Sequence, residues 1–124
     1  MSDSPLLTSK VGSVTVVRFS ENAVLDTLVV EQMRTSLLAL VDAPGPPKIV
    51  IEFQNVDFIS SAALGVFAIV FRRAAQTSAQ VVFSQIRPEL MPVFSLTSLN
   101  RMFRIFESTP QATAFLEAPP AAGG

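Results

Sequence analysis

The sequence contains neither cysteine nor histidine. Without cysteine the chain forms no disulfide, offers no thiolate to a metal and has no thiol nucleophile. Histidine is the commonest general base and metal ligand, so its absence removes the usual partner of a catalytic serine. Charged residues make up only 15% of the chain and the net charge is −1, so composition gives no reason to expect a nucleic-acid partner.

Apolar residues make up 49% of the 124 residues, which is enough for one domain with a hydrophobic core. The apolar run at 62–71 is too short to cross a bilayer, and the first residues lack the basic and apolar parts of a secretory signal. We therefore expect a cytoplasmic protein without membrane insertion. The expected domain covers residues 6–117, between an N-terminal tail at 1–5 and a C-terminal tail at 118–124.

Hydrophobic periodicity and turn residues predict strands that alternate with helices. This order is typical of an α/β fold, here a mixed, mostly parallel sheet of four to five strands with helices packed against it. The expected strands are 6–10, 14–19, 48–53, 79–85 and 101–106, and the expected helices are 26–41, 60–76, 88–99 and 109–118.

Capping residues and prolines set the expected helix ends. Asp26 or Thr27 is the predicted N-cap of the first helix, and Thr109, which precedes a proline, is that of the last. Pro88 suits the first turn of the third helix, while Pro92 is expected to bend or shorten it.

The stretch FISSAALGVF at 58–67 places two serines between a β-like apolar run and an apolar helix. Neither serine has the flanking glycines of a hydrolase elbow, so we do not expect an enzyme. The simplest interpretation is that one serine caps the helix, a contribution of about 1 kcal/mol. The other would then lie exposed at the helix N-terminus, where unpaired amides and the helix dipole tolerate a phosphate. Either Ser60 or Ser61 fits the exposed position at this point.

The second helix is apolar nearly all round, which predicts burial for most of it. Phe67 and Phe71 are four residues apart and are expected to form a partly exposed stripe that binds a partner. Gly65 is expected to permit close packing against a neighbour. It is not part of a phosphate-binding loop, because the chain has no GxxxxGK pattern, and we therefore expect no cofactor.

Three segments resemble the STAS domain of bacterial anti-sigma factor antagonists. VDFISSAALGVF is similar to the family signature apolar-Phe-apolar-Asp-Ser-Ser/Thr-Gly-Leu-Gly-apolar. The Leu-Asp pair at 25–26 resembles the family's Leu-Asp after its second strand. LTSLNRMFRIFES at 96–108 resembles its Leu-Thr-Gly-Leu-Asp-x-x-Phe-x-Ile-Phe segment. The resemblance runs from about residue 6 to residue 116.

The resemblance implies regulation by partner switching. The unphosphorylated antagonist binds a serine kinase of the GHKL ATPase type that is also an anti-sigma factor. Phosphorylation of the signature serine ends the binding, and a PP2C-type phosphatase restores it. Alignment places the phospho-acceptor on Ser61, with Ser60 as second choice and Asp26 nearby across the loops. The expected partner-binding residues are Asp26, Ser60, Ser61, Ala62, Leu64, Gly65 and Phe67.

The chain departs from the signature at four positions. Ser60 replaces the signature Asp, Ala62 the following Ser/Thr, Ala63 a Gly, and Ser98 the Gly of the third segment. The loss of the Asp removes a carboxylate beside the acceptor and leaves Ser60 as a competing acceptor.

The resemblance leaves alternative functions open. One is a non-catalytic accessory or scaffold subunit, either stressosome-like or the partner of a lipid-transport ATPase. Another is a nucleotide-binding module. A weak homodimer is compatible with each of these interpretations.

Overall fold

The computed structural model describes residues 6–118, whose main sheet has five strands in the order β1-β2-β4-β6-β7. The sheet pairs β1 antiparallel to β2, and the remaining neighbours are parallel. The expected α/β class and mostly parallel sheet are therefore confirmed. The predicted tails lie outside the described residues except for Ala118. The strands are β1 (Leu6–Val11), β2 (Val14–Phe19), β4 (Lys48–Glu52), β6 (Gln80–Ser84) and β7 (Ile105–Phe106).

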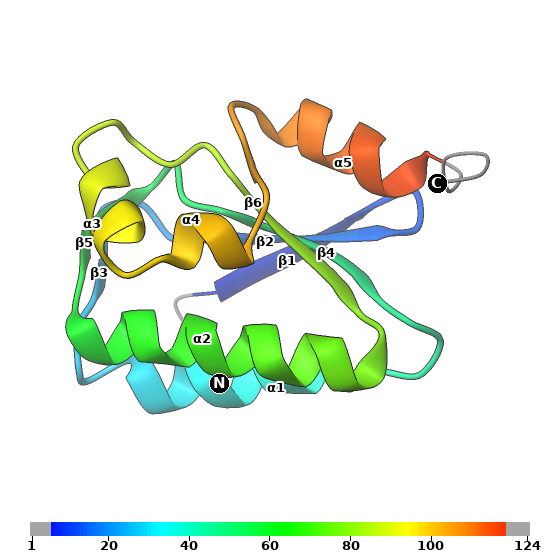
Figure 1. Cartoon of the computed structure of the whole chain (residues 1–124), viewed down its shortest axis with the longest axis horizontal. Helices are drawn as coiled ribbons and strands as arrows, with labels where there is room; N and C mark the ends of the chain where they lie inside the picture. Colours follow the sequence, from blue (N-terminus) through cyan, green and yellow to red (C-terminus); the bar gives the residue numbers. More distant parts are fainter. Residues whose placement is uncertain (1–5, 119–124) are drawn as a thin grey trace.

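Helices cover both faces of this sheet (Figure 1). Helices α1 (Val30–Val41) and α2 (Ser61–Thr77) pack side by side on one face, and α5 (Thr109–Glu117) packs on the other. The short helices α3 (Met91–Leu96) and α4 (Leu99–Met102) connect β6 to β7, and α4 packs on α2. The central strand β4 is buried by both layers, which explains its nearly continuous apolar sequence.

A second, two-stranded sheet was not predicted. Strands β3 (Ala23–Leu25) and β5 (Val56–Ile59) pair in parallel, with Val24 opposite Phe58 and Leu25 opposite Ile59. Both strands are short, and the first follows a polar turn, so the sequence indicates only a connection there. This small sheet positions the two serines, because β5 leads directly into α2.

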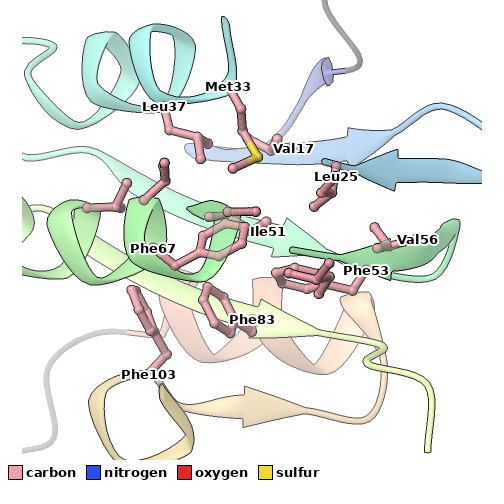
Figure 2. Packing of buried hydrophobic residues seen from close by; sticks show 14 of the residues in the cluster. Val17, Leu25, Met33, Leu37, Ile51, Phe53, Val56, Phe67, Phe83 and Phe103 are labelled. Atoms are coloured by element: carbon pink, nitrogen blue, oxygen red, sulfur yellow. The ribbon is translucent and has the colours of Figure 1, made fainter. Parts of the chain in front are cut away.

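Phenylalanine rings fill the larger core, between the sheet and helices α1 and α2 (Figure 2). Phe53 lies at its centre, with ring centroids 4.9 Å from Phe83, 5.3 Å from Phe94 and 5.4 Å from Phe67. These rings meet edge to face, the arrangement that their quadrupoles favour. A smaller core lies under α5 and is formed by Val14, Val16, Val50, Val82, Ala112 and Leu116.

Two predicted helix caps are wrong. Helix α1 begins at Val30 without a side-chain cap, because the carboxylate of Asp26 instead accepts the amide of Leu28 in the preceding turn. Helix α5 is capped by Ser108, which accepts the amide of Gln111. Thr109 is buried and donates its hydroxyl to the carboxylate of Glu52, so it anchors α5 to β4.

The third helix and the last strand are shorter than predicted. The helix begins at Met91 with Pro92 in its first turn, because Arg87 to Leu90 form a separate turn closed by the amide of Leu90 on the carbonyl of Arg87. Ser98 has a φ of 65°, a left-handed conformation that separates α3 from α4. The last strand keeps only Ile105–Phe106, because residues 99–102 form α4.

Candidate functional site at the junction of β5 and α2

Ser60 is the N-cap of α2. Its backbone is extended, and its Oγ accepts the amide of Ala63 at 3.1 Å. Its own amide donates to the carbonyl of Leu25 at 2.8 Å, which ties the start of α2 to β3. The Ser60 hydroxyl is half-buried and occupied by the cap, so it is poorly placed to attack a phosphate donor.

Ser61 is the first helical residue and is exposed. Its hydroxyl makes no hydrogen bond to any residue between 6 and 118. The amides of Ser61 and Ala62 have no acceptor within the helix, and within the described chain no hydrogen bond from either is present. An anion on Ser61 would therefore meet two unpaired donors and the positive end of the helix dipole.

Asp26 leaves β3 beside the start of α2. Leu25 pairs with Ile59, and Ser60 donates to the Leu25 carbonyl, so Asp26 and Ser61 follow neighbouring strand ends at the same edge. The Asp26 carboxylate is held by the amide of Leu28 at 2.9 Å. The carboxylate therefore lies at the same edge of the small sheet as Ser61, and it pairs with no cation in residues 6–118.

Strands β3 and β5, helix α3 and the turn before α1 lie at one end of the molecule, at the left of Figure 1, and each carries a large exposed apolar side chain. Leu28 is 86% exposed and Leu96 is 84% exposed, and neither is needed by the core. Val24 and Phe58 face each other across the small sheet and are 47% and 50% exposed. None of these four residues was predicted to bind a partner. The outward strand position of Phe58 next to the serines was the available signal.

A groove of about 260 Å³ begins at Ser61 and runs between α2 and the α3–α4 junction. Gly65 lies in it, and a Cβ built on Gly65 meets nothing within 4 Å, so the predicted close packing of a neighbour against Gly65 is wrong. A glycine inside an exposed helix is about 1 kcal/mol less favourable than alanine, so the fold does not explain this residue. The groove is lined by Ser61, Leu64, Gly65, Ala68, Thr97 and Leu99.

The predicted exposure of Phe67 is wrong. Its side chain is fully buried and packs on Phe53 and Phe83, because α2 turns this face toward the sheet. Phe71 is 37% exposed, but it lines a different groove at the other end of α2. Of the other predicted partner-binding residues, Ala62 and Gly65 are exposed and Leu64 is half-buried.

The STAS domain profile matches residues 6–112, which include the whole serine junction described above. The chain belongs to the STAS domain family. The resemblance of the three motifs is thereby confirmed. A Bordetella bronchiseptica protein that carries the name "Putative anti-sigma factor antagonist BtrV" is 30% identical to this STAS domain over 84 residues, which are 68% of this chain and 72% of BtrV.

Solved structures share the fold. An anti-sigma-factor antagonist (STAS) domain protein from Planctomyces limnophilus superimposes with a TM-score of 0.80 at 18% identity, over 90% of this chain and 96% of the other. An anti-sigma factor antagonist from Mycobacterium paratuberculosis gives 0.76 at 23% identity, over 91% and 93%. Phosphorylated SpoIIAA of Bacillus gives 0.70 at 18% identity, over 90% and 99%. At these identities the likeness concerns the fold.

Two further features of the described residues bear on the kind of site. No helix within residues 6–118 is long and apolar enough to cross a membrane. The same part of the chain holds no cluster of acidic residues that could bind a metal ion.

Proposed function

We propose that this STAS domain is an anti-sigma factor antagonist controlled by phosphorylation of Ser61. In this scheme the unmodified protein binds an anti-sigma factor serine kinase of the GHKL ATPase type and thereby frees a sigma factor. Phosphorylation of Ser61 releases the kinase, and a PP2C-type phosphatase restores binding. Family membership and the name of the Bordetella relative support the antagonist role.

The proposal rests mainly on the different hydrogen bonding and exposure of the two serines. Ser60 is engaged as the N-cap of α2, whereas the hydroxyl of Ser61 is exposed and without a partner in the described chain. A kinase therefore reaches Ser61 without opening the helix. Modification of Ser60 would instead remove the cap, at a cost of about 1 kcal/mol.

The surroundings of Ser61 explain how a phosphate would act as a switch. The phosphate adds about −1.5 to −2 charges. The helix N-terminus accepts this charge, so the fold is unaffected. A partner that covers Leu28, Phe58 and Leu96 would have to desolvate the new charge, and Asp26 adds repulsion rather than compensation. The predicted effect is loss of the partner with the fold intact.

The test is phosphosite mapping with the cognate anti-sigma factor kinase and ATP. We expect one phosphate on the wild type, none on Ser61→Ala, and normal incorporation on Ser60→Asp, which keeps an N-cap. Normal incorporation into Ser61→Ala would refute the assignment of Ser61 and move it to Ser60.

The accessory-subunit alternative makes a different prediction. A scaffold or transporter partner would form a complex that is insensitive to a phosphate on Ser61. Size-exclusion chromatography of the complex, with the protein phosphorylated and unphosphorylated, separates the two functions. Co-elution of both forms with the same partner would favour the accessory role.

A further inference from the structure

We propose that a groove at the C-terminal end of α2 binds an extended segment of a partner protein, apolar at its centre and acidic at its flanks, by strand addition to β6. This site is separate from Ser61, and the proposal does not depend on the phosphorylation switch.

The open edge of β6 is the first observation. Phe83 donates its amide to Arg104, and Gln80 donates its amide to Pro47 on the β4 side. The backbone amides and carbonyls of successive strand residues point toward opposite neighbouring strands. Since Gln80 bonds toward β4, the amide and carbonyl of Val81 point away from β4. Strand β7 begins only at Ile105, which pairs with Phe83. In the described part of the chain no β7 residue therefore reaches Val81.

Apolar side chains line the groove beside this open edge, which is the second observation. A groove of about 270 Å³ opens beside β6, and Gln80 is its one polar lining residue among those the structure describes. Three of its large apolar side chains are partly exposed, namely Phe71 at 37%, Met102 at 36% and Phe115 at 43%. The lining residues are Phe71, Ala74, Ala75, Ala79, Gln80, Val81, Val82, Met102, Phe103, Phe115 and Leu116.

The charge at the rim is the third observation and identifies the occupant. Arg104 lies over the ring of Phe115, with its guanidinium carbon 4.9 Å from the ring centroid. Arg72 and Arg101 are exposed and adjoin the lining residues Phe71 and Met102 in sequence. None of the three forms an ion pair within residues 6–118. Arg104 therefore places an unpaired cation beside the groove, which favours acidic residues next to the apolar centre of an occupant.

A peptide suits this site better than a small apolar molecule does. An unpaired strand edge offers backbone donors and acceptors that an extended chain matches, and side-chain pockets beside the edge then give specificity. The groove lies between the C-terminal half of α2 and α5, whereas Ser61 lies at the start of α2. Both sites can therefore be occupied at once.

The test uses a displayed library of random heptapeptides, selected on the full chain. Ala75 is exposed in the groove, so Ala75→Trp fills the groove without disturbing the core. Ala39→Trp, at an exposed position of α1, is the matched control. We expect selected peptides to combine β-branched or aromatic residues with Asp or Glu. Ala75→Trp should weaken the best peptide by about thirtyfold, the effect of losing a central contact, and Ala39→Trp should leave its affinity unchanged.

Two further readouts distinguish strand addition from adhesion to an apolar surface. Bound peptide should slow hydrogen exchange at the Val81 amide, and Arg104→Glu should reverse the preference for acidic flanks. Ser61→Glu should change neither result. The proposal would be overturned if Ala75→Trp weakened the binding of none of the selected peptides. It would also be overturned if bound peptide left hydrogen exchange at the Val81 amide unchanged.

Discussion

The two ends of α2 differ in the groups that they offer to a negative charge. At the N-terminal end, Ser61 and two unpaired amides form a position that accepts an anion on the protein itself. At the C-terminal end, Arg73 donates two hydrogen bonds to the carboxylate of Asp42, the C-cap residue of α1, with N–O distances of 2.8 and 3.1 Å. Arg104, which forms no ion pair within the described chain, lies over Phe115 in the groove at this end.

This difference suggests that one helix serves two kinds of surface. In the proposed switch, the affinity of the apolar N-terminal surface depends on whether Ser61 carries a charge. The C-terminal surface is apolar with a basic rim, so it selects partners that already carry acidic residues. Both ends of α2 are joined by one buried phenylalanine core, so substitutions in the core and at either surface have different expected effects.

Removal of the shared core should affect both ends most strongly. Phe67→Ala deletes a fully buried ring that contacts Phe53 and Phe83, and we expect a loss of about 3–5 kcal/mol in the free energy of unfolding. Urea denaturation followed by circular dichroism measures this loss. Phe58→Ala, at a half-exposed ring, is the control and should cost far less. An equal cost for the two variants would contradict the assignment of Phe67 to the core.

A charge at Ser61 should affect only the N-terminal surface. Ser61→Glu is expected to weaken binding of the anti-sigma factor kinase by about a hundredfold, because the partner must desolvate the carboxylate. Ser61→Gln has nearly the same shape without the charge and should bind far more tightly than Ser61→Glu. Calorimetric titration of both variants measures the difference. Equal affinities would show that shape, not charge, controls the partner.

Loss of the α2 cap should change stability modestly. Ser60→Ala removes the acceptor of the Ala63 amide and is expected to cost about 1 kcal/mol. Ser108→Ala removes the corresponding cap of α5 and should cost a similar amount. Only the first should alter the rate of phosphorylation at Ser61, since only that cap positions the acceptor. Equal rates for both variants would remove Ser60 from the switch.

A side chain on Gly65 should separate stability from binding. Gly65→Ala has room for its Cβ and is expected to raise the free energy of unfolding by about 0.5–1 kcal/mol. Kinase binding should fall at the same time, because the groove beside Ser61 narrows. Ala39→Gly, at an exposed position of α1, is the control and should lower stability without affecting kinase binding. Unchanged kinase affinity in Gly65→Ala would exclude the groove from the interface.

Acid should slightly lower the free energy of unfolding through two carboxylates, those of Glu117 and Asp42. Hydrogen bonds from the Ser13 hydroxyl and amide hold the pKa of Glu117 below its ordinary value of 4.5, and Arg73 lowers the pKa of Asp42. The folded protein then binds fewer protons than the unfolded chain at low pH, so these contributions are present above the ordinary pKa and are lost as pH falls through the folded one. Ser13→Ala should flatten the pH dependence of the urea midpoint below about pH 5. A profile identical to that of the wild type would contradict the Glu117 contact.

The sequence predicts those parts of the fold in which the hydrophobic pattern agrees with the positions of turn and capping residues. Strands β2, β4 and β6 are mostly apolar and bounded by turn residues, and α2 follows the capping residue Ser60. The small β3–β5 sheet was missed because three or four residues do not establish a period. The cap of α5 was misplaced by one residue because Ser108 and Thr109 both precede Pro110, and only the buried carboxylate of Glu52 decides between them.

The candidate site was predictable in its serines and not in its surroundings. The motif selects Ser60 and Ser61, but their separate roles depend on which hydroxyl meets the Ala63 amide. An all-apolar helix does not reveal which face is buried, so Phe67 was assigned to the surface. The exposed Leu28 and Leu96 come from separate segments, and only the folded chain brings these segments to the same end.

The most direct test of the switch compares one partner with two forms of the same protein. Stoichiometrically Ser61-phosphorylated and unmodified protein are titrated into the anti-sigma factor kinase by calorimetry, and the thermal stability of each form is measured in parallel. We expect affinities at least about a hundredfold apart with closely similar melting temperatures. Equal affinity for both forms would contradict the proposed switch.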